Sequence, residues 1–222
     1  MLFIVWLDHQ FKVSFQVVPV REWSQEALHN GLDLLSLCSI NGNLEFDVKV
    51  DARLKGTFKT AHPGRILSHI DGIPTCFAQK VCVKQPYFQR PNKSTSRYSG
   101  DELYRKLAKE IICLDWAAIL LDLTYRFVEQ AVEEHGEPEG GIPSLRFTRT
   151  MLAKDAETNK YYLVEEWLGG KFIKYINNGH PGSCLVDASA EAHRIADFLC
   201  FAQHVQYIST GGLAYTSDYQ GL

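Results

Sequence analysis

The chain has 222 residues, of which 45% are hydrophobic and 22% are charged, and this composition excludes a disordered or low-complexity protein. Such a length suits one domain of two lobes, or two domains. Lysine and arginine number 23 against 26 aspartates and glutamates, a formal charge of −3, so the chain lacks the basic excess that attracts nucleic acid or anionic membranes. We therefore expect neither as a partner.

The first seven residues form an apolar run, but this run lacks a basic leader and stops at Asp8, too early for a signal peptide. No stretch approaches the ~20 apolar residues that span a bilayer. The six cysteines contain no CxxC pair and no regular spacing, unlike a disulfide framework or a zinc ribbon. We therefore expect reduced, mostly buried thiols in a cytoplasmic or nuclear protein.

The N-terminal part of the chain predicts a β-rich lobe that extends to about residue 95. Apolar and polar residues alternate in 11–17 and in 44–50, on both sides of Asn41-Gly42, a period typical of half-buried strands in an antiparallel sheet. The other features expected in this lobe are a turn at Gly56, strands at 75–78 and 81–84, and a polar linker over 89–100.

A long helix is predicted directly after the linker. Ser99 and Glu102 form a capping box, and apolar residues then recur every three or four positions as far as Val132. The stretch holds no further proline or glycine before Gly136, so the helix would run to roughly 50 Å at ~1.5 Å per residue. We expect a bend or break near its middle, with two consecutive helices as the alternative.

Shorter elements are expected in the C-terminal part. Glu137–Pro143 is rich in glycine and proline and predicts a loop, whereas 161–164 has the aromatic and aliphatic residues of a strand. The spacing of apolar residues predicts a helix over about 190–207. A short strand is expected at 213–216, followed by a tight loop at 217–221.

Two charged residues in this framework suit a phosphate-binding site. Lys84 ends an apolar strand, where its stem packs and its ammonium can enter a cleft; the alternative is a lysine that points into solvent. Glu110 lies one position from the apolar stripe of the long helix, within reach of a lysine on a sheet. Such Lys–Glu pairs orient the lysine toward phosphates in kinases, and the alternative is a solvated carboxylate.

Candidate metal ligands lie further along the chain. Asp218 and Gln220 flank Tyr219 beyond the last strand, and a carboxylate and an amide oxygen in one loop suit Mg²⁺ or a base beside it. An Asp-initiated turn is the alternative there. Cys200 and His204, four apart on a helix, can begin a zinc site, although no complete ligand set is visible and a core histidine is the alternative.

Together, three ordered segments resemble the alpha-kinases, atypical protein kinases that include myosin heavy chain kinases, elongation factor kinase and channel-fused kinases. Residues 164–179, VEEWLGGKFIKYINNG, resemble the family's VEpyixGxFxKYNNNxG segment. Residues 198–204 are similar to its AFSHF segment, and 214–221 to its llvxDlQG segment. With weaker matches at 56–61 and 81–84, the resemblance covers roughly residues 44 to 222.

The resemblance implies an α+β, two-lobed, protein-kinase-like fold. The β-rich N-lobe would carry the long helix and end at about residue 163, and a mixed C-lobe, incomplete at its C-terminus, would start at about residue 169. Residues 1–43 would be an unassigned N-terminal extension, and 44–222 the alpha-kinase-like domain. The implied activity is ATP-dependent transfer of the γ-phosphate to serine or threonine hydroxyls of a protein substrate.

The resemblance also assigns residues to ATP. Lys84 would contact the phosphates and pair with Glu110, while backbone N–H groups of 56–59 would cover them. Residues 165–168 would be the hinge that hydrogen-bonds adenine, partly through the main chain. The implied ATP-binding residues are Gly56, Thr57, Phe58, Lys59, Lys84, Glu165, Glu166, Trp167, Leu168 and Gln220.

The remaining implied roles concern catalysis and metals. Asp218 would be the catalytic base beside Mg²⁺ held partly by Gln220, and His204 the first ligand of a structural zinc. In the family, an LTDP segment that serves the metal and a His/Cys/Cys cluster that completes the zinc site follow. This sequence ends at Leu222 before both, so zinc would need ligands beyond it, and we expect little activity from the chain as given.

Two functional classes stay open from the sequence. The first is an active kinase, and the second is a truncated pseudokinase that binds nucleotide or another protein. Lys59 is a smaller departure from the family pattern, because relatives often carry arginine at this position. Lysine keeps the positive charge but lacks the planar guanidinium group.

Overall fold

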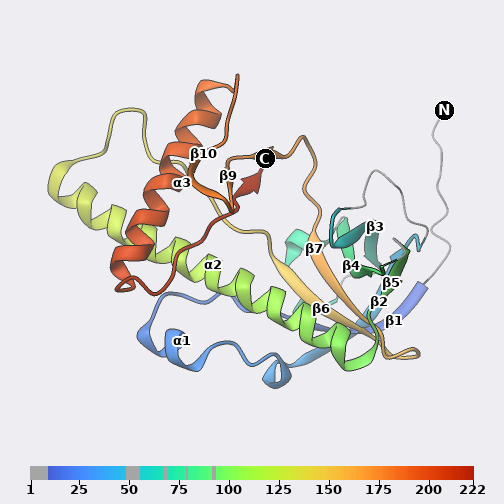
Figure 1. Ribbon diagram of the computed structural model, residues 1–222. Helices are drawn as coiled ribbons and strands as arrows, with labels where there is room; N and C mark the ends of the chain where they lie inside the picture. Colours follow the sequence, from blue (N-terminus) through green and yellow to red (C-terminus); the bar gives the residue numbers. More distant parts are fainter. Residues whose placement is uncertain (1–9, 49–55, 68–69, 79, 92–93) are drawn as a thin grey trace. The chain divides into compact units, whose positions relative to one another are not determined.

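The computed structural model describes residues 10–48, 56–67, 70–78, 80–91 and 94–222 (Figure 1). These residues form two compact units. Unit 1 contains the described residues up to Pro19, of Leu32–Cys113 and of Thr148–Trp167; unit 2 contains Val20–Gly31, Leu114–Phe147 and Leu168–Leu222. The long helix α2, Gly100–His135, contributes its first part to unit 1 and the rest, from Leu114, to unit 2.

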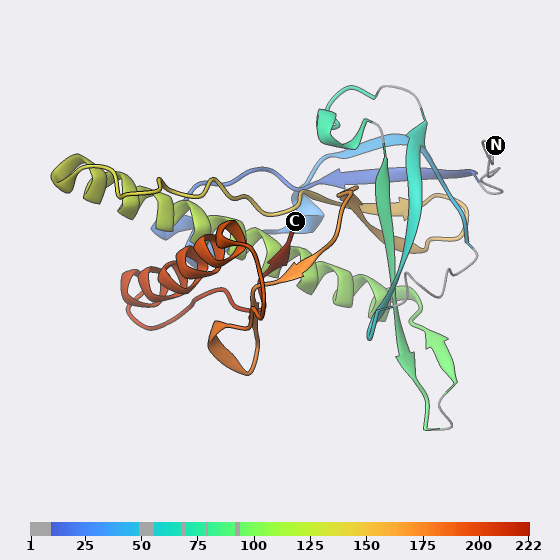
Figure 2. The same cartoon turned by 90° about the horizontal axis from the view of Figure 1, so that it is seen from above.

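Unit 1 is built on an antiparallel sheet of seven strands in the order β3-β2-β1-β6-β7-β4-β5. A further pairing of β3 with β4 joins the first six strands into a closed circuit, and β4 continues past it to pair with β5 (Figure 2). The strands are β1 Gln10–Val17, β2 Ser39–Phe46, β3 Lys59–Leu67, β4 Val81–Gln89, β5 Thr95–Arg97, β6 Thr150–Asp155 and β7 Tyr161–Glu166, and two 3₁₀ turns are η1 Leu34–Ser36 and η3 Thr75–Phe77.

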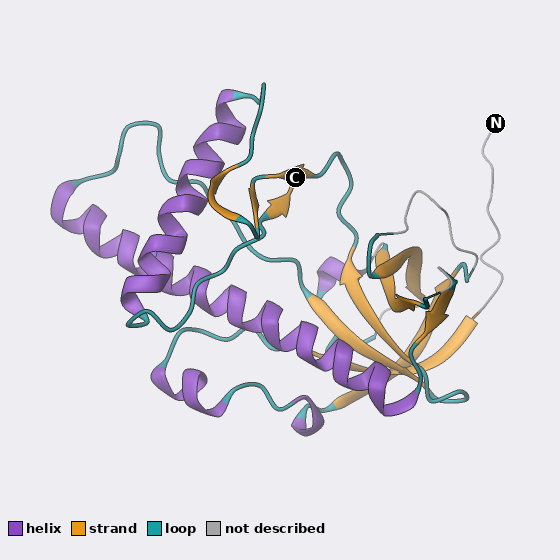
Figure 3. Cartoon of the chain, in the orientation of Figure 1, coloured by secondary structure: helices purple, strands orange, loops and turns teal. Residues whose placement is uncertain are grey.

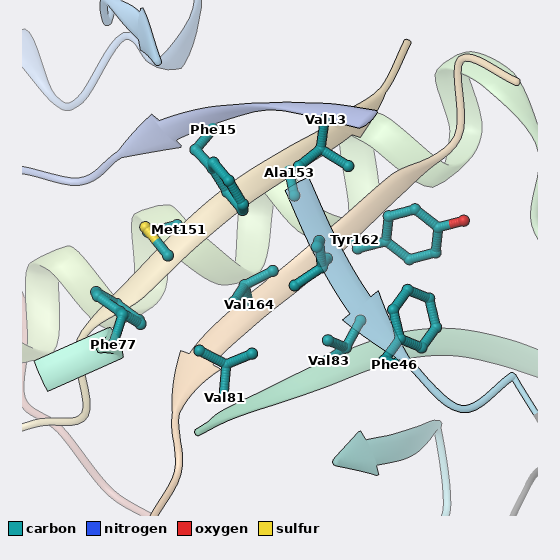
Figure 4. Close-up of a cluster of buried hydrophobic side chains, with 11 residues drawn as sticks. Val13, Phe15, Phe46, Phe77, Val81, Val83, Met151, Ala153, Tyr162 and Val164 are labelled. Carbon is teal, nitrogen blue, oxygen red and sulfur yellow. The ribbon is translucent and has the colours of Figure 1, made fainter. Parts of the chain in front are cut away.

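The inside of this circuit is an apolar core. Along β1, Val13 and Phe15 point inward and are 3% and 0% exposed, which is the burial that the alternating sequence predicts. Burial of such side chains is the main favourable term in folding. The core cluster comprises Val13, Phe15, Leu44, Phe46, Phe77, Val81, Val83, Met151, Ala153, Tyr162 and Val164, most of them drawn in Figure 4.

Strands β6 and β7 are buried on both faces. Ala153 points into the core, whereas Leu152 and Leu163 point outward and pack in a second cluster with Leu107 and Ile111 of α2. The first part of α2 therefore covers the outer face of these two strands. This packing sets the rotation of the helix about its axis, and so decides which helical residues face the sheet.

Unit 2 combines helices with two small sheets. Helix α1, Gln25–Asn30, follows a segment that is tied to α2 by the ion pair of Arg21 with Asp115, at 2.6 Å. The buried amide of Gln206 in α3 donates to Thr124 of α2 at 3.2 Å. The other elements are α3 Ala190–Ser209, β8 Ile173–Lys174, β9 Ile176–Asn177, β10 His180–Ser183 and β11 Gln220–Gly221, with β8 paired to β11 and β9 to β10.

Several predicted elements are confirmed. Strand β1 and helix α3 lie where the sequence places them, and the strand expected at 81–84 forms the start of β4. The expected strand at 161–164 is β7, two residues longer. Residues 137–143 form a loop, as their glycines and prolines predict (Figure 3).

Other predicted elements are wrong. The polar linker expected over 89–100 holds the end of β4 and the whole of β5. Residues 75–77 form the 3₁₀ turn η3 instead of a strand, and 213–216 have no strand structure. Helix α2 runs for 36 residues as one element, so neither the expected break nor the alternative of two consecutive helices is present. Its continuity follows from the lack of internal proline or glycine, together with packing against apolar clusters in unit 1 and buried contacts in unit 2.

Asn41-Gly42 lies inside β2, not between two strands. A Cβ atom on Gly42 would lie 2.2 Å from the Cδ1 atom of Ile70, so a larger residue there would require the end of this side chain to shift. Residues 49 and 50 of the strand expected at 44–50 lie outside the described residues. The domain boundary expected at residue 44 falls within β2, and β1, which precedes that position, pairs with both β2 and β6.

The six cysteines are free thiols. The expectation that most are buried is wrong, because Cys38 and Cys113 are exposed and the other four are only half-buried. Among the described residues, no helix has both the length and the apolar character required to cross a membrane.

We predict that Ile111→Ala destabilises unit 1 by about 2–5 kcal/mol, the usual cost of removing a large aliphatic side chain from a core. Ile111 is 0% exposed and packs α2 on β6 and β7. Urea unfolding followed by circular dichroism measures the change. Cys113→Ala, at an exposed position of the same helix, is the control and should change stability by less than about 0.5 kcal/mol. Equal effects of the two substitutions would contradict the packing.

Candidate functional site

Four charged side chains meet on the outer face of unit 1. Lys84 of β4 forms an ion pair with Glu165 of β7, with 2.5 Å between Nζ and Oε2. Lys59, the first residue of β3, forms an ion pair with Glu110 of α2. We call these four residues the Lys/Glu cluster.

The strand pairing explains how the cluster forms. Cys82 lies opposite Glu165, and Lys84 two residues on lies opposite Leu163, so Lys84 and Glu165 are diagonal neighbours on one face. On the other side of β4, Ala61 lies opposite Lys84, which places Lys59 beside it on the same face. The inward-facing Val81 and Val83 of β4 are in the core, so the charged side chains point outward.

The expected pairing of Lys84 with Glu110 is corrected by this geometry. Glu165 lies on the strand next to β4 and is the nearer partner for Lys84, so Glu110 is paired with Lys59 instead. The sequence does not indicate this exchange, because the β4–β7 pairing joins residues about 80 positions apart. Both lysines nevertheless belong to the same cluster as both carboxylates.

Electrostatics couple the members of the cluster. Burial, and next the ammonium of Lys84, lower the pKa of Lys59 to about 8, while the carboxylate of Glu165 opposes the change. Cys82 also faces the cluster, and burial raises the pKa of its thiol. Two ammonium groups thus lie close enough to repel each other, and an anion bound beside them would relieve that repulsion.

Residues 56–59, which are expected to cover the phosphates, already use some of their backbone groups in hydrogen bonds within unit 1. The amide of Gly56 donates to the carbonyl of Lys59 at 2.8 Å, and Tyr87 donates its hydroxyl to the carbonyl of Gly56. The amide of Tyr87 donates to the carbonyl of Phe58 at 2.9 Å. The Gly56 amide is therefore used inside the segment, while Thr57 and Phe58 are exposed.

The expected hinge begins at the end of β7. Glu165 is 8% exposed and belongs to the Lys/Glu cluster, whereas the carboxylate of Glu166 accepts a hydrogen bond from the amide of Arg149 at 2.9 Å. The amide of Trp167 donates to the carbonyl of Lys80 at 3.3 Å. The Glu166 carboxylate and the Trp167 amide thus make structural bonds in unit 1, and Leu168 is the first residue of the last segment of unit 2.

Asp218 and Gln220 lie at the end of the chain in unit 2. Between them, the ring of Tyr219 is 6% exposed in an apolar cluster, and its carbonyl accepts from the amides of Tyr175 and Ile176 at 2.9 and 3.3 Å. Asp218 adopts a positive φ of 63°. The anchored tyrosine therefore holds two exposed polar side chains, one on each side of it.

Sequence reasoning missed Lys174 as a site residue. Its ammonium forms an ion pair with the Oδ1 atom of Asp218, because Lys174 lies opposite Gln220 in the β8–β11 pairing. Lys174 lies inside the segment with the strongest family resemblance, KFIKYINNG, and this was the signal that could have identified it.

The donor atoms near Asp218 fit magnesium. A carboxylate and an amide are hard oxygen ligands, and Mg²⁺ is usually held by one or two carboxylates together with phosphates and water. Lys174 engages only one oxygen of Asp218. Residues 10–48, 56–67, 70–78, 80–91 and 94–222 contain no group of three or more histidine, cysteine, aspartate or glutamate side chains suited to a metal. Side chains of the described residues alone would therefore not complete the coordination shell of a magnesium ion.

His204 does not form a zinc site with the described residues. It is exposed on α3, and Cys200, one turn earlier, donates its thiol to the carbonyl of Pro181 at 3.5 Å. The role expected for His204 stays a prediction.

The model of the alpha-kinase family matches residues 55–222, about three quarters of the chain. The chain belongs to the alpha-kinase family. No curated protein gave a sequence match.

Solved alpha-kinases have a similar fold. A novel alpha kinase from Entamoeba histolytica is 15% identical with a TM-score of 0.63, over 97% of this chain and 73% of that one. The C-terminally truncated alpha-kinase domain of myosin heavy chain kinase is 15% identical with a TM-score of 0.55, over 96% and 80%. The alpha-kinase domain of myosin heavy chain kinase A in complex with ADP is 15% identical with a TM-score of 0.54, over 97% and 79%.

These findings confirm the family and the α+β alpha-kinase fold that the motifs predict. The structural match covers 97% of the chain, whereas the family model begins at residue 55. Membership of a kinase family places nucleotide binding among the properties of this alpha-kinase.

We predict opposite shifts of the Lys59 pKa when its neighbours are neutralised. Lys84→Met removes a nearby cation and should raise this pKa above about 8, whereas Glu165→Gln removes an anion and should lower it. Titration of the Lys59 side chain by nuclear magnetic resonance measures both. Lys109→Met, at an exposed position of α2, should leave it unchanged.

The same coupling predicts a pH dependence of stability. The pKa of Lys59 rises from about 8 in the folded chain toward the ordinary 10.5 on unfolding, so unfolding takes up a proton between these values. This contribution to the free energy of unfolding therefore increases with pH across that window. A flatter dependence is expected in Lys84→Met, and an unchanged one would contradict the coupling.

Proposed function

We propose that this alpha-kinase is an ATP- and Mg²⁺-dependent protein serine/threonine kinase. The observation that carries the proposal is the Lys/Glu cluster, in which Lys59 and Lys84 hold two ammonium groups on adjacent strands. The triphosphate of ATP supplies several negative charges that suit paired cations. The pKa of Lys59 is lowered first by burial and next by the ammonium of Lys84, and a bound anion would stabilise the charged form of this lysine.

In the proposed reaction, the hydroxyl oxygen of a substrate serine or threonine forms a bond to the γ-phosphorus of ATP. The bond from that phosphorus to the β–γ bridging oxygen breaks, which releases ADP. The proton of the hydroxyl passes to Asp218. Lys174 orients the Asp218 carboxylate, and the buried Tyr219 next to it restricts the movement of the loop.

Asp218 and Gln220 would hold Mg²⁺, together with phosphate oxygens and water. The metal would offset the negative charge of the transferring phosphoryl group. The protein's own contribution is to present one carboxylate and one amide on the two sides of the Tyr219 anchor.

One observation favours a second function, a pseudokinase that binds nucleotide or another protein. The Oδ1 atom of Asp218 is engaged by the ammonium of Lys174. An ammonium on this carboxylate occupies an oxygen that a metal or a substrate hydroxyl would use. Binding of ATP without phosphotransfer would identify this alternative.

We predict that ATP stabilises the protein and that Lys84→Ala removes this effect. A ligand at ~100 times its Kd stabilises the folded state by about 2.7 kcal/mol, which a thermal melt detects. Lys84→Ala deletes one phosphate contact, whereas Lys109→Ala, at an exposed site on α2, is the matched control. An ATP-dependent shift that persists in Lys84→Ala would count against the role of this lysine.

We predict that Asp218→Asn lowers the rate of phosphotransfer by roughly 10²–10⁴-fold, the usual contribution of a positioned base. ATP binding should change much less, because the amide keeps the size and one oxygen of the side chain. Incorporation of labelled phosphate into a test protein, beside the ATP-dependent melt, separates the two effects. Asp101→Asn, at an exposed position in α2, is the control. Robust turnover in Asp218→Asn would remove this residue from the mechanism.

A further inference from the structure

An apolar cavity of about 350 Å³ lies within unit 2, away from Asp218 in the sequence and lined by none of the proposed catalytic residues. Its lining residues come from the last turns of α2, the loop that follows and one face of α3; Figure 3 shows these elements of the backbone. Its volume falls within the ~300–1,000 Å³ typical of ligand pockets. The main apolar residues of its lining are Val128, Val132, Ile142, Pro143, Phe198 and Phe201.

The walls of the cavity are held in place by named contacts. The hydroxyl of Tyr125 donates to the carbonyl of Pro143 and accepts from the amide of Leu145, both at 2.7 Å, which fixes the loop to α2. The rings of Tyr125 and Phe198 stack with centroids 5.6 Å apart. Arg194 of α3 donates to the carbonyl of Gly140 and forms an ion pair with Glu191. The cavity is therefore preformed.

Aromatic side chains continue from the cavity onto the surface. Phe201 lines the cavity and is 41% exposed, and its ring lies 6.2 Å from that of Phe127, which is 45% exposed. Exposed aromatic rings beside a hollow are typical of surfaces that bind other proteins.

The end of α2 and the loop that follows, which supply most of this lining, are strongly acidic, and we call their glutamates the acidic rim. Between residues 127 and 141 the sequence has five glutamates and no lysine or arginine. All five are exposed, and they are Glu129, Glu133, Glu134, Glu137 and Glu139. The one cation in the lining, Arg194, is already paired with Glu191.

We propose that this cavity docks a basic peptide segment of a protein partner. Large apolar side chains of the segment would fill the cavity, and its lysines or arginines would face the glutamates. The charge argues against other occupants. Fatty acids, phosphorylated ligands and anionic lipids would be repelled, and a symmetric second copy would bring two acidic rims together. The proposal goes beyond phosphotransfer and does not depend on it.

The test uses three synthetic peptides of equal length with a fluorescent label. The first has lysines and arginines around a central Trp and Leu, the second has glutamates in place of the basic residues, and the third has serines in place of Trp and Leu. Fluorescence anisotropy with the full chain should show binding of the first peptide. The other two should bind at least tenfold more weakly, and binding of the first should weaken as salt is raised from 50 to 300 mM, estimated from ordinary screening lengths of ~14 to ~6 Å.

Variants locate the binding. Ala131→Trp places a ring in the cavity, and the triple change of Glu134, Glu137 and Glu139 to lysine reverses the charge of the segment that carries the lining; each should weaken binding of the first peptide at least tenfold. The matched triple control changes Asp71, Glu102 and Glu157, which are exposed in unit 1, to lysine and should have less than a threefold effect. If Ala131→Trp fails to fold, as a thermal melt would show, Phe201→Ser replaces it.

Three outcomes would overturn the proposal. They are equal binding of the basic and acidic peptides, binding that the cavity variants leave unchanged, and no binding of the basic peptide at 1 mM, a concentration set by the ~mM affinity of the weakest specific contacts. Concentration-dependent dimerisation that Ala131→Trp abolishes would assign the surface to a second copy instead. Because Asp218→Asn should bind the peptide normally, failure here is distinguishable from failure of the proposed kinase activity.

Discussion

Strand β4 hydrogen-bonds to β3 on one side and to β7 on the other, and the arrangement of unit 1 depends on this double pairing. It closes the six-stranded circuit and leaves β4 with one face in the apolar core and the other outside. Val81 and Val83 then fill the core, and Lys84 must point outward. The same two pairings bring Lys59 and Glu165 to the flanks of Lys84.

The charges of the Lys/Glu cluster have opposing effects on the stability of unit 1. Burial first, and next the nearby ammonium of Lys84, disfavour the charged form of Lys59, and its lowered pKa is the sign of this cost. Glu110 and Glu165 offset part of it, and because Glu110 comes from α2, the helix must keep its rotation against β6 and β7. Core packing and site chemistry therefore share the same contacts, through Leu107 and Ile111.

In unit 2, the polar side chains of Asp218 and Gln220 lie at a very short strand, β11. Strand β11 has two residues, too few to hold Asp218 and Gln220 by ladder bonds alone. The ring of Tyr219 supplies the anchor by packing in the apolar cluster, and its carbonyl accepts two amides from the neighbouring segment. The acidic rim and apolar cavity at the end of α2 show how the same unit carries a second, separate surface.

The sequence by itself determined the elements whose periodicity is local, and the family whose motifs are contiguous. Strand β1, helix α3 and the long α2 follow from spacings of two or of three and four, and the segment 164–179 carries the family resemblance. Only the tertiary structure decided which charges meet. The two residues of each ion pair lie 44 to 81 positions apart in the chain, and strand pairing or helix packing brings them together. The pairs are Lys84–Glu165, Lys59–Glu110 and Lys174–Asp218. A local sequence pattern does not predict these ion pairs, because the partner of a side chain depends on the register of strands that are distant in the sequence.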